Sequence, residues 1–158
     1  MMCNWVEGAI IREEQGAYIS SAEQSNVYAV FVDGSFYIQG ENGRLVVFSL
    51  NSSGDFVFSR HDLQLPFESS SLEQIFLVGC GRDVLSVAVG KFFTWLKVFK
   101  LNRSRMMAWE WEEVKYLKNN NLYLSTMSSV IREVETSRAG NMIYLPRFYQ
   151  DSIVFYSR

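Results

Sequence analysis

The sequence predicts an all-β protein built from short antiparallel strands. Of its 158 residues, 48% are hydrophobic and 15% are aromatic, which is enough apolar material for a packed core. β-Branched and aromatic residues come in short runs, and turn-forming Gly, Asn, Asp and Ser residues separate these runs. Groups of such runs then recur along the chain, so the strands are expected to form repeated units.

The first unit begins with an apolar run at residues 26–32, which Asp33-Gly34 closes before a second apolar run at 35–39. Two apolar runs joined by a two-residue Asp-Gly turn predict a β-hairpin. Two more turns, at 41–43 and 51–54, lead to strands expected at 44–50 and 55–59. The unit is therefore predicted to be a four-stranded antiparallel meander.

Two later segments repeat this organisation. The second unit has strands expected at 74–78, 83–89, 92–101 and 108–114. In its last strand aromatic and aliphatic residues alternate with glutamates, which places them on opposite faces. The third unit has strands expected at 121–125, 141–145 and 152–156, while residues 127–135 fit either a strand or one helical turn.

A short sequence recurs at the spacing of these units, as Val47-Phe48, Val98-Phe99 and Val154-Phe155. A four-stranded unit that repeats at about 50 residues is typical of kelch-like β-propeller blades. A β-sandwich or barrel is the alternative, but neither is expected to repeat one strand at blade spacing. The sequence therefore predicts a partial kelch-like β-propeller with about three four-stranded antiparallel blades, near 27–60, 75–115 and 121–157.

The predicted propeller domain covers residues 26–158, after an N-terminal segment, 1–25, expected to be an edge strand or poorly ordered. Closed propellers use about four to eight blades, so three leave the ring open. We therefore expect a fragment, a truncated relative or a chain that completes its ring with a partner. Exposed blade faces should make the isolated chain self-associate, aggregate or fold only marginally.

Composition excludes several classes of function. The net charge of −2 lacks the basic excess that nucleic-acid binding requires. No run of 18 apolar residues exists, so no membrane association is expected. Cys3 and Cys80 are too few for a disulfide framework and form no metal clip, which indicates a reducing compartment. Because the N-terminus does not resemble a signal peptide, the expected location is cytoplasmic or nuclear.

No catalytic, cofactor-binding or metal-binding residue is predicted. His61, the only histidine, is interpreted as a surface residue in a loop between blades. Gly79-Cys80-Gly81 is interpreted as a hairpin turn, because no third glycine or helix follows to complete a phosphate loop. Glu112 and Glu113 are neighbours on a strand and point to opposite faces, so they cannot act together on one bond. Trp95, Trp109 and Trp111 are expected to pack between blades, with a sugar- or peptide-stacking surface as the alternative.

Three segments carry a family resemblance in their order and spacing. Residues 26–50 read NVYAVFVDGSFYIQGENGRLVVFSL, residues 97–123 read KVFKLNRSRMMAWEWEEVKYLKNNNLY, and GNMIY follows at 140–144. Together they resemble the plant F-box-associated KIB-type β-propeller family, also filed as plant domain of unknown function 295. The resemblance covers most of residues 26–157.

The chain departs from this family in four places. Residues 1–25 are too short for an F-box, and the early blades have no counterpart. Lys118-Asn119-Asn120 stands where Gly-Asp is usual, and Leu145-Pro146-Arg147 replaces an aromatic followed by acidic residues. From these departures we expect that the chain does not join a ligase on its own and that it is only marginally stable alone.

The resemblance implies a kelch-like propeller. In full-length relatives an N-terminal F-box docks on the Skp adaptor of a cullin-type (SCF-type) ubiquitin ligase, and the propeller recruits the protein that is to be ubiquitinated. We therefore expect a non-catalytic protein-interaction domain with no cofactor, a protein partner of unknown identity and an unknown binding surface. The Skp adaptor is not expected to bind this chain alone. One alternative is a propeller enzyme or carbohydrate-binding domain, which would gather Asp33, Glu73, Arg82 and Asp83 around one cavity; another is a truncated paralogue without activity.

Overall fold

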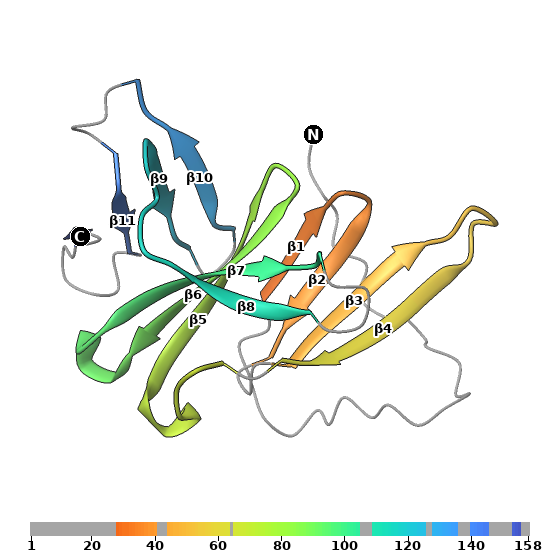
Figure 1. Cartoon of the computed structure of the whole chain (residues 1–158), viewed down its shortest axis with the longest axis horizontal. Coiled ribbons are helices and arrows are strands. Elements are labelled where there is room, and N and C mark those ends of the chain that lie inside the picture. The colour runs from red at the N-terminus through yellow and green to blue at the C-terminus, as the bar shows by residue number, and fades with distance from the viewer. Residues whose placement is uncertain are drawn as a thin grey trace.

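The computed structural model describes residues 28–40, 44–63, 65–104, 109–125, 128–135, 140–145 and 153–155. Within these residues the chain forms three four-stranded β-sheets (Figure 1). The N-terminal segment 1–25 and the turn expected at 41–43 lie outside the described residues. The all-β, blade-like architecture predicted from the sequence is confirmed.

The first sheet is the predicted antiparallel meander, with its strands in chain order. It comprises β1 (Tyr28–Val32), β2 (Ser35–Gln39), β3 (Arg44–Leu50) and β4 (Phe56–Asp62). Asp33 (φ 51°) and Gly34 (φ 79°) both have positive φ, as a type I′ hairpin turn requires. β4 runs further than expected, to Asp62, because it stays paired with β3 as far as Arg44, whose guanidinium lies 3.2 Å from the Asp62 carboxylate.

The second sheet is also an antiparallel meander in chain order. After a short 3-10 turn, η1 (Ser69–Ser71), it comprises β5 (Leu72–Cys80), β6 (Asp83–Gly90), β7 (Leu96–Asn102) and β8 (Glu110–Val114). The expected third strand, 92–101, was wrong at its start. Phe92 and Phe93 belong instead to a tight turn, η2 (Lys91–Phe93), and both have positive φ, which no extended strand can accommodate.

The third sheet departs from a simple meander. It comprises β9 (Asn120–Tyr123), β10 (Val130–Glu133), β11 (Met142–Tyr144) and β12 (Ile153–Phe155), in the order β10-β9-β11-β12. The stretch left open at 127–135 therefore contains a strand. β11 pairs with β9 in parallel. Consequently Val154-Phe155 lies in the fourth strand of its sheet, whereas Val47-Phe48 and Val98-Phe99 both lie in the third.

Hydrogen bonds at the start of β9 and just before β11, most of them to asparagines, explain this parallel pairing. The Met142 backbone N–H donates to Asn121 Oδ1 (3.0 Å), and the Asn141 N–H donates to the Asn120 carbonyl (2.8 Å). Asn141 Oδ1 accepts from the Leu117 N–H (2.8 Å). These bonds hold the start of β11 beside β9, so the chain returns to β9 and not to β10.

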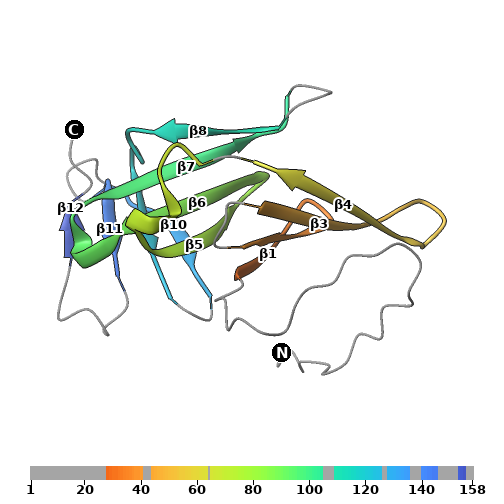
Figure 2. The same cartoon turned by 90° about the horizontal axis from the view of Figure 1, so that it is seen from below.

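The second sheet is the central layer of the molecule (Figures 1 and 2). β5 contacts β1 on one side and β10 on the other, so the inner edge strands of the three sheets meet. Gly79 allows this approach, since a Cβ there would lie 2.9 Å from Val32 Cγ2. One core cluster, which includes Val32, Val47 and Leu77, joins the first two sheets, and another, which includes Val87 and Leu122, joins the second and third.

Burial along the strands follows from this layering. β6 is buried at every position after Asp83, because a sheet covers each of its faces. From Phe36 onward, exposed or partly exposed residues of β2 alternate with buried ones, because the second sheet covers only one of its faces. One face of the first sheet therefore has no other described sheet against it.

Candidate functional site

The four charged residues considered for an enzymatic cavity do not form one cluster. Arg82 Nη2 lies 3.3 Å from Asp33 Oδ2, across the turns that follow β5 and β1, and both side chains are well exposed. Asp83 instead pairs with Lys100 of β7 at 2.8 Å. Glu73 lies near the start of β5, at the opposite end of that strand from Arg82. The arrangement gives two surface ion pairs, and it does not favour an enzyme.

Arg103, which is partly buried, contacts both the first and the second sheet near the β5–β6 turn. Arg103 Nη1 donates to Tyr37 Oη (2.5 Å), and the guanidinium also lies over the Tyr37 ring. Arg103 Nη2 donates to the backbone carbonyl of Arg82. Arg103 therefore joins the first sheet to the second through Tyr37 and contacts the β5–β6 turn of its own sheet through Arg82, which is a structural role.

His61 does not lie in a loop, as the sequence suggested, but in β4, where its ring stacks on Trp109 at 4.0 Å between centroids. Its Nε2 is 3.2 Å from Ser59 Oγ. Burial lowers the pKa of His61 below its usual value. The sequence did not predict a strand at His61, because residues 59–62 are all polar and lack the alternation that indicates a strand. The stack is a packing contact between the first two sheets.

Two of the three tryptophans expected between blades pack there, whereas Trp95 packs on Gly90 of its own sheet and on Phe67, in the segment before that sheet. Trp109 and Trp111 border the core between the first and second sheets. Trp95 lies 4.9 Å from Phe67 between ring centroids, and its indole leaves no room for a Cβ at Gly90. Cys80 is half-buried, and burial, followed by the Asp83 charge, raises the pKa of its thiol, which keeps it protonated.

The turn between β6 and β7 presents an aromatic side chain to solvent. Phe92 (φ 53°, ψ 26°) and Phe93 (φ 56°) occupy its two central positions, and the Thr94 N–H donates to the Lys91 carbonyl (3.1 Å). This is type I′ geometry, for which Asn-Gly is the preferred pair. Phe92 is 88% exposed. Adopting the left-handed backbone conformation costs an ordinary L-residue roughly 1–2 kcal/mol of free energy. The turn is therefore strained at both of its central residues.

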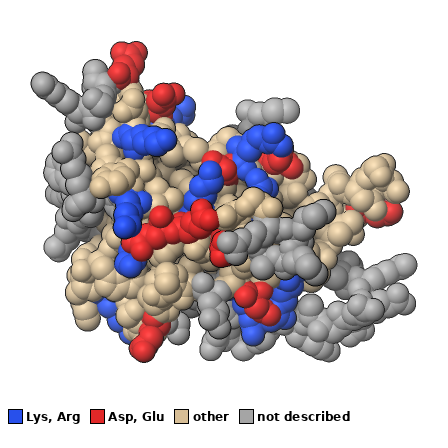
Figure 3. Space-filling view, viewed as in Figure 1, with Lys and Arg blue, Asp and Glu red and all other residues tan. Residues whose placement is uncertain are grey.

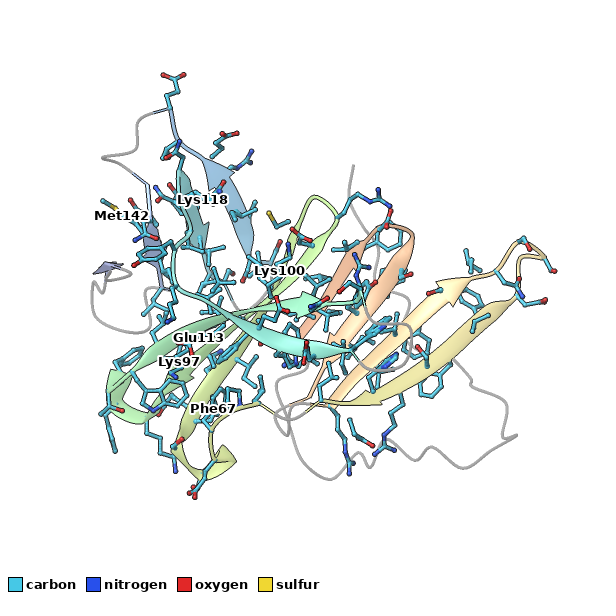
Figure 4. All side chains as sticks on the ribbon, in the orientation of Figure 1. Phe67, Lys97, Lys100, Glu113, Lys118 and Met142 are labelled. Carbon is cyan, nitrogen blue, oxygen red and sulfur yellow. The ribbon has the colours of Figure 1, made fainter. Side chains whose placement is uncertain are left out.

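Charges on the face shown in Figure 3 are mixed, with basic and acidic side chains interspersed. Figure 4 shows one such pair, Lys97 of β7 beside Glu113 of β8, 3.5 Å apart. Such exposed pairs contribute little to stability, and they leave no large single-sign area on that face.

No metal site or membrane span is found in the described part of the chain. Its His, Cys, Asp and Glu residues include no group of three or more that is placed to hold a metal ion. Among the same residues, no helix has the length and apolar character to cross a bilayer.

The three-sheet fold agrees with the comparison to protein families. The family model described as "KIB1-4 beta-propeller" matches residues 5–157. The chain belongs to the KIB1-4 beta-propeller family. KIB1-4 propellers are typically associated with F-box proteins and are generally non-catalytic binding domains. No curated protein and no solved structure is significantly similar to this KIB1-4 propeller chain.

Proposed function

We propose that this chain is a non-catalytic protein-interaction domain of the kind that recruits substrates to SCF-type ubiquitin ligases. Its family membership supports the general class. The absence of a common cluster among Asp33, Glu73, Arg82 and Asp83 gives the enzyme alternative no support.

The observation that carries the proposal is the aromatic turn at Lys91–Phe93. Strained backbone that the surrounding structure maintains is concentrated at functional sites, and exposed aromatic residues are common binding hot spots. Trp95, packed on Gly90 and Phe67, supports the base of this hairpin. The turn therefore fixes the direction in which the Phe92 side chain leaves the backbone, and this lowers the entropic cost of placing its ring in an apolar pocket of a partner protein.

The test separates binding from folding. Replacing Phe92→Asn together with Phe93→Gly supplies the residues that type I′ geometry prefers, so the free energy of unfolding should rise by about 1–2 kcal/mol. The same variant should lose the protein partners that the unmodified chain captures from a plant extract. Thermal melting and quantitative mass spectrometry of the captured proteins measure the two effects.

A matched control is Tyr116→Ser, which removes another exposed aromatic residue, 55% exposed, from the segment between β8 and β9. The set of proteins that this control captures should be unchanged.

A second experiment fuses an F-box to the chain. A captured partner should then become ubiquitinated in a reconstituted ligase reaction, and the fusion that carries Phe92→Asn/Phe93→Gly should not support this. If the double variant captures the same proteins equally well, the turn is not the recruiting site.

A further inference from the structure

One face of the first sheet carries a continuous row of phenylalanines. Phe31, Phe36, Phe48 and Phe58 are direct cross-strand neighbours, one from each of β1–β4. Directly opposed residues of antiparallel strands point to the same face. The row and the large apolar residues two positions along β2, β3 and β4 form what we call the phenylalanine face. It is made of Phe31, Phe36, Ile38, Val46, Phe48, Leu50, Phe56 and Phe58.

This face lies opposite the one that packs on the second sheet. The residues buried against the second sheet, such as Val32, Tyr37 and Val47, have the other parity along their strands. Phe31 is 61% exposed, Phe36 50%, Leu50 59% and Phe58 48%. The first sheet therefore has two apolar faces, and the described part of the chain covers only one of them.

Neighbouring rings within the row already contact each other. The ring centroids of Phe31 and Phe36 are 4.7 Å apart, and those of Phe48 and Phe58 are 5.2 Å apart. Packing of each ring on its neighbour restricts its rotamers before any partner arrives, which reduces the entropic cost of association.

We propose that two copies of this chain associate through their phenylalanine faces, sheet against sheet, about a two-fold axis. Such an interface is self-complementary, because the same patch is used twice. The row of rings from one copy can pack in offset or edge-to-face contact with the row from the other. The opposite face of the same sheet already packs against the second sheet. The proposed contact with a second copy would be of the same kind, a β-sheet packed face to face on a β-sheet.

Charge and area both fit a second copy. The charged residues on this side of the strands are Arg44, Arg60 and Asp62, and all three lie at its border. The Asp62 carboxylate lies 3.2 Å from the Arg44 guanidinium and 3.5 Å from that of Arg60, so this ion-paired group leaves the apolar centre of the face free of charge. The exposed parts of the aromatic side chains and Leu50 give roughly 500 Å² of apolar area. A standard interface buries about 800 Å² per partner, so this apolar centre with a polar rim is sufficient for a stable dimer.

Sedimentation equilibrium and light scattering on the purified chain test the proposal. The unmodified protein should have twice the mass of one chain. In the variant Phe36→Ser/Phe58→Ser, which interrupts the centre of the row, the dissociation constant should rise by about tenfold or more. Phe56→Lys, at a site 77% exposed in one copy, should also weaken the dimer without affecting folding, because the new charge must be buried on association.

The matched control is Phe92→Ser, which removes the 88% exposed phenylalanine of the β6–β7 turn and should leave the dimer intact. A monomeric unmodified protein at all concentrations would overturn the proposal. So would a dimer that persists with unchanged affinity in Phe56→Lys, or one that Phe92→Ser also dissociates. Because the recruiting turn and the phenylalanine face are changed by different variants, failure of this proposal does not affect the test of the proposed function.

Discussion

A single side chain shows how this chain differs from the usual pattern of its family. Lys118 has φ 56°, in the left-handed region. The family resemblance seen in the sequence implies glycine at this position. Glycine adopts this conformation without the clash that a Cβ introduces. The side chain of Lys118 is exposed, so it gains little from packing that would offset this strain.

Lys118→Gly should therefore stabilise the protein. The expected gain in free energy of unfolding is about 0.5–1 kcal/mol, the relief of left-handed strain less the entropic cost of glycine. Urea unfolding measures it. Lys115→Gly is the control, since Lys115 is also exposed but lacks a positive φ, and it should destabilise slightly. A loss of stability in Lys118→Gly would contradict the strain argument.

His61 should make stability depend on pH. Burial against Trp109 lowers its pKa in the folded state, so the unfolded chain binds the proton more readily. Stability is therefore greatest above the unfolded pKa of 6.5 and falls as the pH decreases below it, levelling off below the folded pKa. Urea unfolding between pH 8 and pH 5 should show this fall, which His61→Gln should reduce. An equal slope in both proteins would assign the pH dependence to other groups.

At the scale of elements, local turn chemistry decided which strands could be predicted. Asp33-Gly34 matches its type I′ turn, and the hairpin was predicted correctly. Phe92-Phe93 has the same turn geometry but reads as a strand, because both residues have high β propensity and the strain appears only in the folded chain. The parallel pair of β9 and β11 was missed for another reason. Backbone N–H groups that donate to the Asn121 and Asn141 side chains fix this pair, and periodicity carries no information on such bonds.

The contact between β2 and β6 contains one buried polar pair. Ser86 Oγ donates to Gln39 Oε1 at 2.8 Å, and both residues are almost fully buried. Gln39 Nε2 is buried with no hydrogen-bond partner among the described residues. The pair therefore provides a hydrogen bond for the amide oxygen of Gln39 but none for its buried amide nitrogen. The cost of burying that nitrogen reduces the net contribution of the pair to stability.

Ser86→Ala should destabilise by about 1–3 kcal/mol, because it leaves the buried Gln39 amide unpaired at both ends. Adding Gln39→Met, an apolar side chain of similar size, should recover most of that loss. A thermodynamic cycle of urea unfolding over the two single variants and the double variant measures the coupling. Additive effects would show that the two side chains do not interact.

At the scale of the whole molecule, the sequence predicted the number of sheets but not which faces they cover. The recurrence of Val47-Phe48 and Val98-Phe99 located equivalent third strands, since blade spacing is recorded in the sequence. Exposed aromatics such as Phe31 and Phe56 look like core residues, because alternation indicates a sheet face without indicating what covers it. The sequence predicted that the terminal blades would expose apolar faces, but it did not identify the residues of the phenylalanine face or of the aromatic turn.

The layering predicts where the molecule opens first. β6 is paired on both sides, with β5 and β7, and buried on both faces, whereas β4 is an edge strand with mostly exposed side chains. Amides of Asp83–Gly90 exchange only when the central sheet separates from its neighbours, so they should be the slowest in native-state hydrogen exchange. Amides of Phe56–Asp62 should exchange through local opening, at a lower free energy. Equal protection of β4 and β6 would mean that the molecule opens as one cooperative unit, and that the central layer has no greater local stability than the edge.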